Sequence, residues 1–262
     1  MMIQNAISNI PDDWKVQIFY VKNGASQFGL DINPGIQKWI ENGKVILTVI
    51  ADEVFKTKRK KFELMVEPWL WENMLADRVL TFGGTTVLCS NSPYRIGNFS
   101  EFDYIGTPWS FKKGAGGDGA VSLRNRKAML AAIQFELDKI GDDPAKRSTA
   151  YKSWGQEDQF FVSRLLDMKK AGLYDANIAK KEDTHRFGGN NEVFNNDILG
   201  VSGTLPAITY NERQSFFSFC PEMKMHYPAL HDPSCFGASP NGTLCGSTVC
   251  ALKPKSMRKG GC

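Results

Sequence analysis

The segment ELMVEPWLWENMLADRVLTF (residues 63–82) decides the fold class, because a helical pattern is followed directly by a strand pattern. Large apolar side chains recur through residues 63–76 and give a helix a broad apolar face. The run RVLTF (78–82) is short and rich in β-branched and aromatic residues, which is typical of a strand buried on both faces. We therefore expect a helix at about 63–76 and a strand at 78–82.

Two similar apolar runs precede this segment, KVQIFYV (15–21) and KVILTVI (44–50). A helical stretch from Asn33 to about Asn42 lies between them. Alternation of strand, helix and strand at this spacing indicates a doubly wound α/β fold, with a mostly parallel sheet flanked by helices. Because α/β domains of about 250 residues are common, we expect residues 1–262 to form a single domain.

Further along the chain, two more helices are predicted at about 123–137 and 157–171. Residues after about 172 are rich in Gly, Pro and Asn and carry short apolar runs, so we expect irregular structure wrapping the sheet. The end of the chain, residues 237–262, is expected to form an irregular basic tail.

The charge balance limits the classes of partner. The chain has 32 basic and 28 acidic residues, a net charge of +4. This excess is too small to favour nucleic acid or a membrane surface, but it suits a phosphorylated small ligand. No apolar run approaches the roughly 18 residues of a membrane span, and the first residues do not resemble a leader. A cytoplasmic location is the default expectation.

The six cysteines are too few for a disulfide scaffold, and we expect free thiols. A bridge within residues 235–262 and a zinc site at Cys245 and Cys250 remain open as alternatives. The sequons Asn98-Phe-Ser and Asn241-Gly-Thr would matter only in a secretory lumen.

The most distinctive motif is the glycine-rich run GAGGDGAVSLRNR (114–126). Its glycines allow the backbone to approach a ligand closely. We expect Ser122 to cap a helix whose first turn carries Arg124 and Arg126, an arrangement that suits an oxyanion or sugar hydroxyls. A plain surface loop that enters an ordinary helix is the alternative.

Two adjacent carboxylates, Glu157 and Asp158, begin the helix predicted at 157–171. A carboxylate within hydrogen-bond reach of a hydroxyl can accept its proton and act as a general base. Acidic residues are also common at helix N-termini simply because the helix dipole stabilises them. His231, in the turn His231-Asp232-Pro233, could donate to a phosphate or bind a metal, or it could be satisfied by the backbone.

Several motifs in the same order resemble the family called domain of unknown function 5672, which is glycosyltransferase-like. The resemblance covers about residues 12–236. It implies a GT-A type, Rossmann-related fold and transfer of a sugar from a nucleotide sugar to a hydroxyl acceptor, with Asp158 as the base and Glu157 orienting the acceptor. The motifs are DDWKVQIFYV, WLWENMLADRVLTF, LCSNSP, FDYIGTPW, GGDGAVSLRNRKAML, EDQFF and CPEMKMHYPALHDPSCFG. The expected donor- and acceptor-binding residues are Gly116, Gly117, Asp118, Ser122, Arg124, Arg126, Trp109, Trp154 and His231.

The chain departs from the family pattern in two places. Where similar proteins have Gln-Thr-Asp-Ser after the third strand, this chain has Gly83-Gly84-Thr85-Thr86, so Thr85 replaces the carboxylate. A hydroxyl is a poor substitute for a carboxylate in holding Mn²⁺ or Mg²⁺, so we do not expect a metal-dependent mechanism unless Asp118 or Glu157 compensates. The strand that similar proteins place before the first helix is expected to be missing. A non-catalytic glycan- or nucleotide-binding relative is therefore the second hypothesis.

Overall fold

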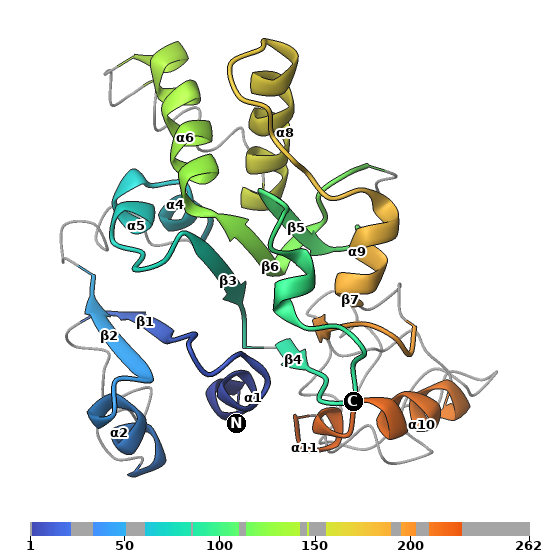
Figure 1. The fold of residues 1–262 in the computed structure, drawn as a ribbon. Helices are drawn as coiled ribbons and strands as arrows, with labels where there is room; N and C mark the ends of the chain where they lie inside the picture. The colour runs from blue at the N-terminus through green and yellow to red at the C-terminus, as the bar shows by residue number, and fades with distance from the viewer. Residues whose placement is uncertain are drawn as a thin grey trace, which may run out of the picture.

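The structure of the protein is a computed structural model that describes residues 2–21, 34–50, 61–84, 86–109, 114–141, 146, 156–189, 195–202 and 210–226. Within these ranges it is a mixed α/β structure with three small sheets (Figure 1). Helices α6 and α8 extend side by side from one end of the central sheet (Figure 1). The elements near the N-terminus and the late helices α10 and α11 lie toward the other end (Figure 1).

The first sheet confirms the strands predicted from the two earliest apolar runs. Strands β1 (Val16–Tyr20) and β2 (Val45–Val49) pair in parallel. Helix α2 (Pro34–Glu41), close to the predicted 33–42, connects them and packs on β2. The preceding helix α1 (Met2–Asn9) lies against β4 and β1.

The helix predicted at 63–76 is interrupted. It consists of α4 (Lys61–Met65) and α5 (Pro68–Glu72), with Pro68 at the first position of α5. A proline has no N–H to continue the helix and its ring clashes with the preceding turn, so the helix restarts there. Strand β3 (Arg78–Phe82) follows as predicted.

The central sheet has the order β3-β6-β5, and β6 is antiparallel to both neighbours. Strand β5 spans Tyr104–Thr107 and β6 spans Asp118–Asn125. The expectation of a mostly parallel sheet is wrong for the described residues, where only short parallel pairs occur. The physical reason is the length of the connection: about ten residues separate β5 from β6, fewer than the dozen or more that a crossover between parallel neighbours requires.

The predicted helix at 123–137 begins later than expected. Residues 118–125 form β6, and helix α6 (Arg126–Ile140) starts after it. Asn125, rather than Ser122, caps this helix, because the Asn125 side chain accepts a hydrogen bond from the backbone N–H of Lys127. Ser122 and Arg124 therefore lie on a strand.

The third sheet and the helices after residue 172 correct the expectation of wholly irregular structure. Strand β8 (Gly200–Ser202) pairs antiparallel with β4 (Thr86–Leu88) and parallel with β7 (Gly188–Gly189). The helices of this region are α9 (Lys181–Phe187), α10 (Tyr210–Phe219) and α11 (Glu222–His226).

A disulfide joins Cys89, just after β4, to Cys220, just after α10. The expectation of free thiols is therefore wrong for these two residues. Their partners could not be chosen from the sequence, because 131 residues separate them. The other four cysteines, at 235, 245, 250 and 262, lie outside the described residues.

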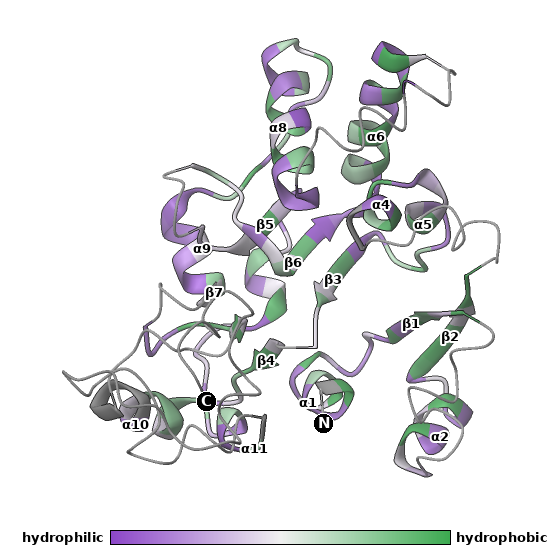
Figure 2. Cartoon of the chain, turned by 180° about the vertical axis from the view of Figure 1, so that it is seen from behind, coloured by the Kyte–Doolittle hydropathy of each residue, from purple (hydrophilic) through white to green (hydrophobic). Residues whose placement is uncertain are grey.

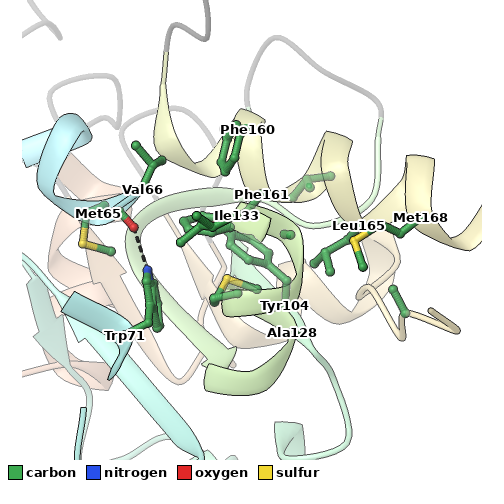
Figure 3. Close-up of a cluster of buried hydrophobic side chains, with 14 of the residues drawn as sticks. Met65, Val66, Trp71, Tyr104, Ala128, Ile133, Phe160, Phe161, Leu165 and Met168 are labelled. Atoms are coloured by element: carbon green, nitrogen blue, oxygen red, sulfur yellow. Dashed lines mark hydrogen bonds between the residues drawn. The ribbon is translucent and has the colours of Figure 1, made fainter. Parts of the chain in front are cut away.

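Helix α8 (Glu157–Lys170) begins where predicted and packs against α6. Together with α4 and α5 these helices enclose the largest apolar cluster, in which Trp71, Phe161 and Leu165 are fully buried (Figure 3). The indole N–H of Trp71 donates to the carbonyl of Met65 at 2.6 Å and ties α5 to α4 (Figure 3). By contrast, α9 is largely hydrophilic along its length (Figure 2).

Candidate functional site

Five polar or aromatic side chains meet where the central sheet contacts α8. Tyr104 lies on β5, Trp109 follows that strand, Arg124 lies on β6, and Glu157 and Asp158 open α8. We call these five residues the buried polar centre. All are buried, with Arg124 and Tyr104 0% exposed and both carboxylates 6% exposed.

Arg124 is the charge around which this centre is organised. Its Nη2 lies 2.8 Å from Oε2 of Glu157, and its Nε donates to Oγ of Ser122 at 2.8 Å. Ser122 and Arg124 reach each other because residues two apart on a strand point to the same face. The Arg124–Glu157 contact is a close ion pair between two buried side chains.

Aromatic rings surround the same guanidinium. Its central carbon lies 5.0 Å from the ring centre of Tyr104, 5.4 Å from that of Phe161 and 5.9 Å from that of Trp71. A cation over an aromatic face is attracted by the ring quadrupole, more so where water is excluded. The rings and Glu157 together compensate the cost of burying the charge.

The electrostatics set the protonation states of Arg124 and Tyr104. Burial by itself lowers the pKa of Arg124, but the carboxylate of Glu157, helped by Tyr104 and Asp158, more than offsets it and leaves the pKa above its ordinary value. Burial raises the pKa of Tyr104 well above its usual range, although Arg124 opposes that shift. Arg124 therefore stays charged and Tyr104 stays neutral.

Asp158 links three parts of the chain. Its Oδ2 accepts from the indole N–H of Trp109 at 2.8 Å and from the backbone N–H of Gly119 at 3.3 Å. Its Oδ1 accepts from the backbone N–H of Gln159 at 2.8 Å. The carboxylate thus fixes the start of α8 against β6 and the segment after β5.

The glycines of the 114–119 segment approach protein atoms. At Gly116 and Gly117, where φ is +99° and +100°, an added Cβ would lie 2.4 Å from the side chain of Val162 and 2.4 Å from the carbonyl of Thr107, respectively. At Gly119 it would lie 2.6 Å from Glu157 and 2.7 Å from Arg124. The absence of side chains here allows the segment to pack against β5 and α8.

Other predicted residues lie apart from this centre or outside the described ranges. Arg126 donates to the carbonyl of Met74 and pairs with Asp77, at the connection between α5 and β3. The carboxylate of Asp118 accepts from the backbone N–H of Ala120 at 2.7 Å. The residues outside the described ranges are Thr85, Trp154 and His231.

Sequence reasoning missed Asp103, a further buried carboxylate, which lies beside β5. Its Oδ1 accepts from the amide of Asn125 at 2.7 Å and from the hydroxyl of Tyr174 at 3.2 Å, and its Oδ2 accepts from the backbone of Asn177 at 2.9 Å. The sequence feature that could have identified it is an acidic residue between two aromatic residues, Phe102 and Tyr104, at the start of a strand. Its contacts join β5, the end of β6 and the segment before α9.

A cavity of about 250 Å³ lies elsewhere, between α1, β4 and α11. None of the predicted site residues lines it. One of its walls is Glu222, whose Oε1 accepts from the backbone N–H of Ser90. The lining residues are Gln4, Asn5, Ser8, Asn9, Val87, Ser90, Glu222 and Met225.

Within the part of the chain that the structure describes, no three His, Cys, Asp or Glu side chains gather closely enough to hold a metal ion. The helices in those same ranges include none with the length and apolar character needed to cross a bilayer.

A family model with the description "Protein of unknown function (DUF5672)" matches residues 44–199, more than half of the 262 residues. The matched span includes β3, β5, β6, α6 and α8, and therefore the whole buried polar centre. No curated protein and no solved structure gives a significant match. The chain belongs to the family of proteins of unknown function designated DUF5672.

Proposed function

We propose that this protein is a glycosyltransferase that moves a sugar from a nucleotide-sugar donor to a hydroxyl acceptor. The observation that supports this most is the meeting of Glu157 and Asp158, at the start of α8, with Trp109 and the glycine-rich 114–119 segment. A carboxylate can accept the proton of an acceptor hydroxyl, and an indole ring can stack against a sugar.

In this proposal Asp158 is the general base. Transfer breaks the bond between the anomeric carbon and the diphosphate and forms a bond to the acceptor oxygen, whose proton passes to a carboxylate. Glu157 orients the acceptor, and Arg124 holds Glu157 through the 2.8 Å ion pair. In the same proposal, the 114–119 segment and Trp109 contact the sugar. No step is assigned to a divalent cation.

A second candidate is a glycan- or nucleotide-binding relative without transfer activity. The observation that favours it is the use of both oxygens of Asp158 by protein N–H groups, from Trp109, Gly119 and Gln159. A base must release one of these contacts to accept a proton from an acceptor. If the contacts persist when ligand binds, the carboxylate acts only in positioning α8.

The first experiment measures thermal unfolding with UDP- and GDP-sugars, with and without manganese. A ligand at 100 times its Kd adds about 2.7 kcal/mol to the free energy of unfolding. The transferase and a nucleotide-binding relative both predict a shift with at least one nucleotide sugar. The absence of a shift with every donor would contradict both.

The second experiment separates the candidates. Sugar transfer to hydroxyl acceptors is measured for the wild type, for Asp158→Asn and for Asp167→Asn, a half-exposed carboxylate on the same helix, as the control. A transferase loses turnover in Asp158→Asn, retains it in Asp167→Asn and still binds donor in both. Donor binding without transfer in the wild type would instead establish the binding-only candidate.

A further inference from the structure

The disulfide between Cys89 and Cys220 indicates the environment in which the chain folds. Cys89 is 3% exposed and Cys220 is 0% exposed, and both belong to an apolar cluster with Phe216 and Phe217. Disulfides form and persist in oxidising compartments and are rare where glutathione and thioredoxin keep thiols reduced. A structural cross-link in an apolar cluster therefore points to a secretory lumen, in place of the cytoplasmic default.

In a secretory lumen the sequon Asn98-Phe99-Ser100 can be glycosylated. It lies at the end of a short 3-10 helix, η3 (Ile96–Phe99), between β4 and β5. Asn98 and Ser100 are exposed, whereas Phe99 is 3% exposed and packs edge-on against Phe187. The apolar residue anchors the turn, and the two residues that define the acceptor motif face solvent.

The amide of Asn98 is also suited to carry a substituent. Its Oδ1 accepts from the backbone N–H of Arg95 at 2.7 Å, whereas its Nδ2 donates no hydrogen bond to any described residue. A glycan is attached through Nδ2 and leaves the carbonyl oxygen intact. The Arg95 contact therefore survives modification, and the exposed side chain gives the sugar room outside the fold.

We propose that Asn98 is an N-glycosylation site of this protein. The co-reactant is a lipid-diphosphate-linked oligosaccharide of the secretory lumen. The bond between its first sugar carbon and the diphosphate breaks, a bond from that carbon to Nδ2 of Asn98 forms, the lipid diphosphate leaves, and Nδ2 loses one proton. This inference does not depend on the proposed sugar transfer.

The test expresses the full chain in the lumen of a eukaryotic secretory host and maps its peptides by mass spectrometry, with and without peptide N-glycosidase. The background is Asn241→Gln, which removes the sequon outside the described residues. On it are placed Ser100→Ala, which breaks the Asn98 motif but keeps the asparagine, and Ser100→Thr, which preserves the motif. The same maps, taken without reductant, report whether Cys89 and Cys220 are linked.

The expected result is a glycan on the peptide that contains Asn98, removed by peptide N-glycosidase. The glycan persists in Ser100→Thr and is absent in Ser100→Ala, and Cys89 and Cys220 are linked. An unmodified Asn98 in protein with the disulfide intact would overturn the proposal. Free thiols at Cys89 and Cys220 in the folded lumenal protein would overturn it as well, because the compartment argument depends on that cross-link.

Discussion

The buried polar centre and the C-terminal apolar cluster are two cores held together by different physical means. The C-terminal apolar cluster consists of Val87, Cys89, Ile198, Val201, Phe216, Phe217, Cys220 and Met223. The polar centre places a guanidinium, surrounded by aromatic side chains, beside two buried carboxylates. The apolar cluster contains no charge, and a covalent bond closes it.

This difference determines how each core responds to change. A buried charge must be matched in position by its partner, so the polar centre is sensitive to small displacements and to loss of one group. An apolar cluster tolerates displacement better, but this one depends on segments distant in the chain. The disulfide limits the freedom of its unfolded state. The polar centre thus fixes how α8 is positioned on the central sheet, and the cross-link holds the end of α10 next to β4.

The largest expected effect comes from Arg124→Met, which leaves Glu157 buried without its cation. Breaking a buried ion pair by removing one partner costs about 3–5 kcal/mol. Urea unfolding measures the loss, and Lys127→Met, with its side chain 73% exposed, should change stability by less than about 0.5 kcal/mol. The double variant Arg124→Met/Glu157→Leu should recover part of the loss. A loss similar to that of Lys127→Met would show that the pair contributes no net stability.

Removal of the cross-link tests the other core. Cys89→Ala/Cys220→Ala should lower the free energy of unfolding by about 2–4 kcal/mol, because the closed loop is long. Hydrogen exchange should show faster opening of α10 and α11, with β6 and α8 still protected. Equal loss of protection in both regions would mean that the two cores unfold as one unit.

Gly119→Ala tests how tightly the polar centre is packed. The added methyl would lie within 2.7 Å of Glu157 and Arg124, so the pair must shift. Overpacking of this kind costs about 1–3 kcal/mol. Gly83→Ala is the matched control, since its Cβ would meet only the carbonyl of Ala120, at 3.7 Å. Equal thermal stability of the two variants would contradict the packing described here.

The smallest expected effect is that of Trp109→Phe, which keeps an aromatic ring but removes the N–H that donates to Asp158. Loss of one such hydrogen bond costs about 1 kcal/mol. Trp69→Phe, whose indole N–H donates to none of the described residues, is the control for the change of ring size. If the two variants are equally stable in urea, the Asp158–Trp109 contact is not a stabilising one.

Sequence reasoning located the elements whose signal is local. The strands at 15–21, 44–50 and 78–82 and the helix beginning at Glu157 were found because apolar periodicity and flanking polar residues mark them. The start of α6 was misplaced because VSLRN is compatible with a helix. Pairing on both sides with β3 and β5 makes it a strand instead.

The candidate site was predicted only in part, for the same reason. The adjacency of Glu157 and Asp158 was visible in the sequence, but their contacts with Arg124, Trp109 and Gly119 join residues that are 33 or more positions apart. No periodic pattern specifies such contacts. The glycines were expected to approach a ligand, and the structure shows that they also approach β5 and α8, because both kinds of close approach require the same residue.

The sequence by itself determined that this is an α/β protein, where several of its strands and helices lie, and the family to which it belongs. These are properties of local pattern and of motif order. Only the tertiary structure decided the antiparallel central sheet, the Arg124–Glu157 pair and the Cys89–Cys220 cross-link. Each depends on which distant segments meet, and a chain settles that by burying its apolar faces and compensating its buried charges together.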